Sequence, residues 1–150
     1  MTRIATGRDF REVARRRLPH FLFEYYDGAA FDGVTARANE AALGLVQLRQ
    51  RVLRDVSRCS LNTQYWNEPV ALPIVLGPVG LAGLAARRGE VQAARAARTV
   101  GIPFTLSSTS LCPLDEVASV MPPWFQLYMV RDRTFVSKMI AWAIEQGCTT

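Results

Sequence analysis

The spacing of apolar residues divides the chain into two parts that meet near residue 73. In the first part, apolar residues recur at helical intervals, as Phe10, Val13 and Leu18 do along one helix face. This spacing predicts helices over residues 8–18, 20–28 and 34–48, then an extended piece over 52–57 and an extended connection or small hairpin over 61–73. We therefore predict an N-terminal helical and extended segment, residues 1–72.

From Pro73 onward, short apolar runs alternate with helical stretches. Strands are predicted to start at residues 73, 103 and 123 and near residue 149. Helices are predicted between them, over residues 89–101, 113–121 and 133–147. Repeated strand–helix alternation is typical of a parallel sheet with crossover helices, so we predict an α/β fold for residues 73–150.

Three complete strand–helix units fit between Pro73 and Gly147. A closed eight-stranded barrel needs ~250 residues, whereas an open doubly wound sheet needs fewer. The units therefore form either a small open sheet or the front of a barrel whose remainder lies outside this chain. We expect the second arrangement, because Thr149 and Thr150 stand inside the predicted fourth strand.

An uncharged run covers residues 69–86 and reaches the lower length limit of a membrane span, at eighteen residues. It contains three prolines and three glycines, and Pro73 and Pro78 bracket its most apolar part. Because proline and glycine interrupt helices, a short buried strand followed by a glycine-rich loop fits better. We predict that this run does not span a membrane.

Composition narrows the classes of partner. The net charge is +5, but the arginines are dispersed and Lys138 is the only lysine, so no phosphate-binding stripe forms and nucleic acid is not expected as a partner. Three cysteines without a CxxC spacing and a single histidine, His20, indicate reduced thiols and no metal site. The N-terminus lacks the apolar core of a signal peptide, so a cytoplasmic protein is expected.

Neutral residues follow the predicted strands, at the edge where parallel α/β folds carry their sites. Ser107 and Gln126 can hydrogen-bond to the edge of a heterocycle, and a Gly-Pro-Val-Gly turn would let a flat ligand approach the backbone. Neither GxGxxG nor a Walker loop is present for phosphate. The pattern favours a planar cofactor with carbonyls and ring nitrogens. The residues at this edge are Gly77, Pro78, Val79, Gly80, Ser107, Ser108, Thr109, Gln126 and Tyr128.

Five blocks in chain order resemble one known family. They are FLFEYYDGAA, LRQRVLRDVS, PIVLGPVGLAGLAARRGEVQAARAA, GIPFTLSSTSLCPLDEVA and WFQLYMVRDR. Together they resemble the FMN-dependent α-hydroxy acid dehydrogenases and oxidases, most closely the bacterial respiratory L-lactate dehydrogenases. The resemblance implies an FMN-binding (β/α)8 TIM barrel behind a helical segment, of which this chain would hold the segment and the first three strand–helix units.

The resemblance also implies residue roles. Ser107 and Gln126 would hydrogen-bond the isoalloxazine ring of FMN. Tyr25 would bind the substrate carboxylate and Tyr128 the substrate hydroxyl region. The backbone that would line the ring belongs to Pro78, Val79 and Gly80. The catalytic histidine, the carboxylate-binding arginines, a lysine near the flavin and the phosphate-binding loop would all lie beyond residue 150, so this chain alone is expected to be inactive.

The reaction implied is oxidation of L-lactate to pyruvate, with electrons passed through FMN to a quinone or another respiratory acceptor. A homo-oligomer, attached peripherally to the inner face of the membrane, is expected for the complete protein. The alternatives are a sister enzyme for mandelate or glycolate, and a non-catalytic half-barrel. Gly80 and Thr109 leave room beside the substrate, which disfavours glycolate.

The sequence differs from the family pattern at one place, shortly after Tyr25 and Tyr26. Family members usually carry Gly-Gly or Ser-Gly there, whereas this chain has Gly28 and Ala29. If position 29 requires a positive φ, alanine adds strain of about 1 kcal/mol.

Overall fold

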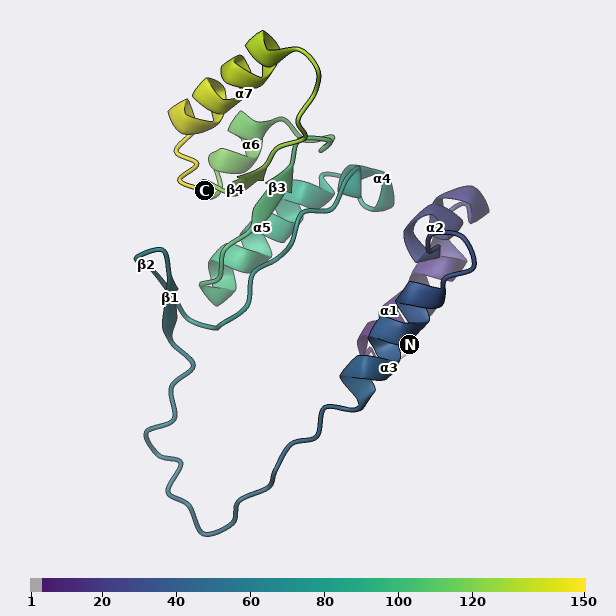
Figure 1. Ribbon diagram of the computed structural model, residues 1–150, viewed down its shortest axis with the longest axis vertical. Helices are drawn as coiled ribbons and strands as arrows, with labels where there is room; N and C mark the ends of the chain where they lie inside the picture. The colour runs from purple at the N-terminus through teal and green to yellow at the C-terminus, as the bar shows by residue number, and fades with distance from the viewer. Residues whose placement is uncertain (1–3) are drawn as a thin grey trace. The chain divides into compact units, whose positions relative to one another are not determined.

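The computed structural model describes residues 4–150. They fall into two compact units, Met1–Arg58 and Cys59–Thr150. The first unit holds helices α1 (Gly7–Arg17), α2 (His20–Asp27) and α3 (Val34–Gly44), and the second holds the strands and the remaining helices (Figure 1). The predicted extended piece at 52–57 is irregular, since residues 46–62 form neither helix nor strand.

Side-chain bonds fix the start of α1 and join it to α2. Thr6 and Asp9 form a capping box, in which the Asp9 carboxylate accepts from the Thr6 backbone N–H at 2.8 Å. Arg11 donates to both carboxylate oxygens of Asp27, at 2.5 and 2.7 Å, and its guanidinium lies 5.7 Å from the centre of the Phe23 ring. These contacts hold the last turn of α2, which carries the two tyrosines, against α1.

Ala29 does not adopt a positive φ. The left-handed residues of the turn between α2 and α3 are Phe31, with φ of 50°, and Gly33, with φ of 66°. The strain considered for Ala29 therefore does not arise.

The second unit begins with a tight hairpin of strands β1 (Thr63–Tyr65) and β2 (Glu68–Val70). Its two turn residues, Trp66 and Asn67, both have positive φ, as a type I′ turn requires. The hairpin lies against the sheet region, because the Trp124 indole N–H donates to Glu68 at 3.3 Å and the Trp66 ring centre lies 4.9 Å from that of Trp124. Residues 59–72 accordingly belong to the same compact unit as residues 73–150.

The parallel sheet is built from β3 (Thr105–Ser107) and β4 (Trp124–Gln126), with Leu76 joined to Phe104 by one parallel bridge. The strand predicted from residue 73 is thus reduced to that bridge. Pro73 and Pro78 lack the backbone N–H that a ladder needs, which limits pairing at both ends. At the other edge, the Phe125 N–H donates to the Thr150 carbonyl at 2.7 Å, where a fourth strand was predicted.

Helices α4 (Ala82–Ala85), α5 (Gly89–Val100), α6 (Leu114–Ala118) and α7 (Arg133–Glu145) alternate with these strands, as Figure 1 shows. The last three pack on one face of the sheet. The buried residues of that core include Val91, Ala94, Ala97, Phe104, Leu106, Leu114, Val117 and Ala143. The α/β prediction is confirmed at this level, although the strands of residues 4–150 do not close a barrel.

The uncharged run at residues 69–86 contains the end of β2, the Leu76 bridge and the four-residue helix α4. Within residues 4–150, no helix is both long and apolar enough to cross a bilayer.

Candidate functional site

The end of the sheet brings Ser107 and Gln126 together. The two residues stand opposite each other in the parallel register of β3 and β4. Leu106 faces the helices and is 1% exposed, so its neighbour Ser107 points to the opposite face of the strand. There the Ser107 hydroxyl donates to Oε1 of Gln126 at 3.0 Å. The structure places both residues at the expected edge of the sheet and shows a direct contact between them.

A third polar residue, Thr109, orients this pair. The hydroxyls of Thr109 and Ser107 lie 2.9 Å apart, and the Thr109 N–H donates to the Ser107 oxygen at 3.2 Å. Ser107 has one hydroxyl proton, which it gives to Gln126, so Thr109 must be the donor between the two hydroxyls. With its carbonyl oxygen held by Ser107, Gln126 is left to present its amide N–H groups to a ligand.

The turn after the Leu76 bridge borders this network. A Cβ added at Gly77 would meet nothing within 4 Å, so the backbone there is open to approach. A Cβ at Gly80 would lie 2.8 Å from Oγ1 of Thr109, so this position needs glycine as long as Thr109 stays in place. The Leu81 N–H donates to the Thr109 carbonyl at 3.1 Å and ties the turn to the residues after β3.

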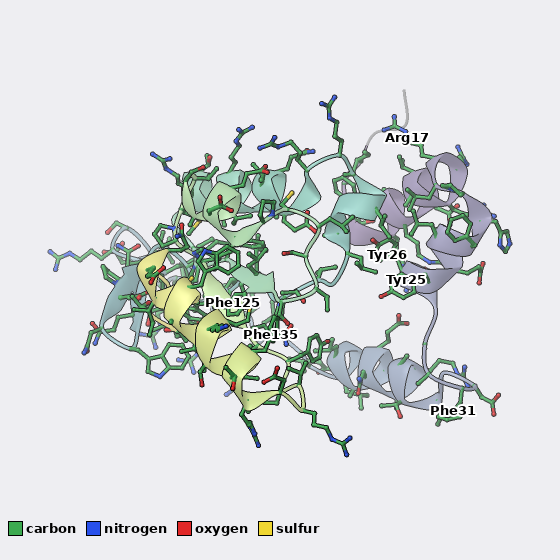
Figure 2. The ribbon with its side chains drawn as sticks, turned by 90° about the horizontal axis from the view of Figure 1, so that it is seen from above. Arg17, Tyr25, Tyr26, Phe31, Phe125 and Phe135 are labelled. Carbon is green, nitrogen blue, oxygen red and sulfur yellow. The ribbon has the colours of Figure 1, made fainter. Side chains whose placement is uncertain are left out.

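The two tyrosines lie in different units. Tyr128 follows β4, its ring is exposed, and its backbone N–H donates to the Ser108 hydroxyl at 3.2 Å, which keeps it beside the β3 end. Tyr25 lies in the last turn of α2, where its ring meets that of Tyr26 edge-on at 5.2 Å (Figure 2). The structure thus gathers Tyr128 with the Ser107–Gln126 edge, and it places Tyr25 in the first unit.

A buried carboxylate that the sequence did not reveal lies behind this edge. Glu90, in the first turn of α5, is 1% exposed, and one of its oxygens accepts from the N–H groups of Gly83 at 2.9 Å and Leu111 at 3.1 Å. Burial would raise the pKa of Glu90, but the backbone donors, Leu111 first, outweigh it and hold that pKa below its usual range. Burial and the nearby Glu90 carboxylate raise the pKa of the Cys112 thiol.

A glutamate at the start of a helix is common on protein surfaces, where its negative charge interacts favourably with the helix dipole. The signal that could have identified Glu90 was its place directly after a stretch with four glycines, residues 77–89. In the part of the chain that the structure describes, no three His, Cys, Asp or Glu side chains gather as a metal site.

Comparison with known families decides the class of protein. The sequence model described as FMN-dependent dehydrogenase matches residues 14–150. The chain belongs to this family. FMN is therefore the cofactor to test against the geometry above.

The chain is similar to L-lactate dehydrogenases over 98% of its length. It is 54% identical to the enzyme of Chromohalobacter salexigens and 52% identical to that of Acinetobacter baumannii strain ATCC 17978, in both cases over 149 residues. It spans 38% and 39% of those two proteins.

Solved structures of the family share its fold. A mandelate oxidase is similar with a TM-score of 0.91 and 33% identity, covering 97% of this chain and 43% of that one. A soluble mutant of the membrane-associated (S)-mandelate dehydrogenase from Pseudomonas putida gives a TM-score of 0.88 and 33% identity, covering 95% and 41%. A mandelate oxidase mutant solved with a C4a-OH-FMN adduct is similar with a TM-score of 0.88 and 33% identity, covering 93% of this chain and 43% of that one.

The sheet edge of this chain has groups that fit a flavin ring. The ring system offers carbonyl oxygens and ring nitrogens along one edge, and the oriented amide of Gln126 and the hydroxyls of Ser107 and Thr109 are neutral groups that match them. The open backbone at Gly77 leaves room for a flat face. The donor set therefore suits the ring of FMN.

Proposed function

We propose that the protein to which this chain belongs is an FMN-dependent L-lactate dehydrogenase, which oxidises L-lactate to pyruvate and passes the electrons to a respiratory acceptor. One observation carries the choice of substrate. The chain is 52–54% identical to proteins named L-lactate dehydrogenase but 33% identical to the mandelate enzymes. Because the chain spans less than two fifths of those relatives, the activity is proposed for the whole protein.

In this proposal the second unit binds the flavin ring. Gln126 donates its amide N–H to the ring edge, Ser107 keeps the amide turned that way, and the backbone of Pro78, Val79 and Gly80 lines the ring. When bound, FMN supplies the redox chemistry by accepting a hydride equivalent from the substrate carbon. These residues bind the flavin ring and orient it. Because their groups are neutral, any charge that balances the reduced ring would come from other parts of the protein.

The substrate would be held by the two tyrosines. The phenol of Tyr25 donates to the carboxylate and the phenol of Tyr128 to the hydroxyl region of the 2-hydroxy acid. Both rings are exposed, at 60% and 59%, which suits a role in ligand contact rather than in core packing. We expect the base, the cationic carboxylate clamp and the phosphate site from residues beyond 150, and residues 1–150 alone to be inactive.

At the level of the fold, we propose that residues 73–150 are the first three units of a (β/α)8 barrel and residues 1–72 the segment before it. The likeness to mandelate oxidase supports this, at a TM-score of 0.91. A quinone acceptor, peripheral membrane attachment and a homo-oligomer are part of the same proposal. The membrane-associated nature of the similar mandelate dehydrogenase supports the attachment.

A panel of 2-hydroxy acids tests the choice of substrate. With the FMN-loaded protein, we expect kcat/KM for L-lactate to exceed the values for (S)-mandelate, glycolate and D-lactate by at least about tenfold, a difference of roughly 1.4 kcal/mol in transition-state binding. Likeness to the mandelate oxidase and dehydrogenase structures makes mandelate the second candidate. Fast mandelate oxidation beside slow lactate oxidation would favour that sister enzyme.

A further inference from the structure

Backbone pairing stops before it reaches the turn that would line the flavin. Leu76 is joined to the β3 segment by two bonds, from its N–H to the Pro103 carbonyl at 3.0 Å and from the Thr105 N–H to its carbonyl at 2.9 Å. After Leu76, the chain leaves the sheet as the turn at residues 77–83. Beyond Leu76, the bond from the Leu81 N–H to the Thr109 carbonyl is the backbone contact of this turn with the residues after β3, so a side chain that joins the two adds to what sets its position.

Glu90 supplies such a connection. A single carboxylate oxygen accepts from Gly83, where the turn at residues 77–83 runs into α4, and from Leu111, in the loop after β3, at 2.9 and 3.1 Å. Gly83 follows the Leu76 bridge and Leu111 follows β3, so the two donors come from two different segments of the parallel sheet. The bond from Leu81 to the Thr109 carbonyl runs between the same two loops.

Two glycines make room for this carboxylate. A Cβ at Gly83 would lie 3.1 Å from the second oxygen of Glu90 and 3.0 Å from the Leu111 Cβ. A Cβ at Gly89 would lie 2.7 Å from the Ala82 carbonyl oxygen. Loop, helix start and carboxylate approach one another this closely because both positions lack a side chain.

Glu90 is stabilised by hydrogen bonds rather than by an ion pair. A buried carboxylate is unfavourable unless it is paired or well hydrogen-bonded. The neighbouring cation Arg88 pairs with Glu116 of α6, and Glu90 lies at the N-terminus of the twelve-residue helix α5, where a negative charge is favoured. Its Oε1 accepts from backbone N–H groups of both loops, whereas its buried Oε2 has no hydrogen-bond partner among the described residues, so the bonds that Glu90 makes fix the two loops.

We propose that Glu90 is a positioning residue of the flavin site, whose carboxylate holds the turn at residues 77–83 against the loop at residues 107–111. The inference rests on the proposed function, because it takes the backbone at Pro78–Gly80 and the side chains of Ser107 and Gln126 as contacts of one ring. Glu90 acts through these groups and does not itself touch the ring. Its loss would leave the Leu81–Thr109 backbone bond as the remaining described hydrogen bond between the two loops and would loosen the two sides of the ring site relative to each other.

The test compares Glu90→Gln with Glu116→Gln in the FMN-loaded protein. The control removes the carboxylate of Glu116, which pairs with Arg88 just before α5 and makes no described bond to either loop. We expect E90Q to raise the Kd for FMN by about tenfold or more, since both charge-assisted bonds are weakened, and to change the visible circular dichroism of the bound flavin. E116Q is expected to leave both within about twofold of the unaltered protein.

A second measurement follows the loops directly and needs no cofactor. Hydrogen exchange at the Gly83 and Leu111 amides should accelerate by at least about tenfold in E90Q and not in E116Q. If E90Q does not fold, Glu90→Asp keeps the charge on a side chain too short to reach both donors, and the same order of effects is expected.

The outcomes separate the two proposals. An E90Q protein with a lower Tm but unchanged FMN affinity and flavin spectrum would overturn the positioning role and leave the proposed function standing. Failure of the unaltered protein to bind FMN would overturn the proposed function and this inference with it.

Discussion

The single hydroxyl proton of Ser107 determines which way the neighbouring amide faces. The Thr109 hydroxyl donates a hydrogen bond to the Ser107 oxygen, and the Ser107 hydroxyl donates one to the carbonyl oxygen of Gln126. The amide is thus directed by two residues that lie two positions apart on the same segment. A small change in that segment should be felt at the Gln126 N–H groups.

Ser107→Ala tests this orientation. Without the hydroxyl, the Gln126 carbonyl loses its donor and the amide can turn, so we expect FMN binding to weaken by about tenfold. Flavin fluorescence titration measures the change. Ser119→Ala serves as the control, because its hydroxyl bonds only to the Glu116 carbonyl at the end of α6, and an equal loss in both variants would contradict the expectation.

Gly80 and Thr109 form a pair whose effects should not add. In Gly80→Ala the new Cβ would meet Oγ1 of Thr109 at 2.8 Å, and removing that oxygen by Thr109→Ala makes room for it. We expect Gly80→Ala to weaken FMN binding by about tenfold when Thr109 is present, and by less than about threefold when it is added to the Thr109→Ala variant. Equal losses in the two backgrounds would show that the pair is not coupled.

At the scale of the elements, the longer helices follow more closely from the sequence than the strands, although α3 ends at Gly44 rather than near residue 48 and the short helix α4 was not predicted. The helix predicted over residues 89–101 is α5, Gly89–Val100, and it ends where Gly101 takes a positive φ of 76°. The strand predicted from residue 73 is a single bridge, because prolines at both ends remove donors that hydrophobic periodicity does not count. A helix is held by hydrogen bonds between residues four apart, so its extent can be read from nearby residues. A strand is held by hydrogen bonds to another segment, so its length depends on a partner that is distant in the sequence.

The candidate site shows the same limit. Ser107 and Gln126 were predicted to share an edge because both follow strands, and their 3.0 Å contact agrees with that reasoning. Glu90 was not predicted, since its burial depends on two loops folding over it, which neither charge nor spacing along α5 encodes. Nor could the role of Thr109 as a donor be deduced without the register of β3 and β4.

The buried carboxylate should make the second unit sensitive to acid. The pKa of Glu90 is lower in the folded protein than in the unfolded chain, so the unfolded chain takes up the proton first as the pH falls. Its stabilisation is therefore complete above the unfolded pKa of about 4.3 and is lost as the pH falls through the lower folded pKa. We expect the free energy of unfolding, measured with urea between pH 7 and pH 3.5, to fall less steeply in E90Q than in the unaltered protein.

Across the whole molecule, uncovered apolar surface accompanies the open ends of the sheet. Ile140 and Ile144 lie one turn apart on α7 and are 44% and 65% exposed. They border a hollow with Phe125 of β4 and the last residues of the chain, where a further barrel unit would pack in the proposed fold. Such a face is expected to bind other copies of residues 1–150 when nothing covers it.

Substitution of both isoleucines tests whether this face is uncovered in residues 1–150 and covered in the complete protein. Ile140→Lys with Ile144→Lys should reduce self-association of residues 1–150, measured by light scattering, at least about threefold. Thr134→Lys, which adds a charge in the exposed first turn of α7 and off the face of Ile140 and Ile144, should change it little. In the complete protein the same double change should lower Tm, because the two side chains would be buried there, and an unchanged Tm would contradict the barrel proposal.

The contact between Trp66 and Trp124 gives the hairpin an optical signature of its own. Their ring centres lie 4.9 Å apart at 67°, close and inclined enough for the two indole transitions to mix and split the circular dichroism band they produce. The third tryptophan, Trp142, lies on α7 and makes no ring contact with them in the described chain. Loss of the split band in Trp66→Phe would identify its origin, and the band would then report hairpin docking during refolding in the unlabelled protein.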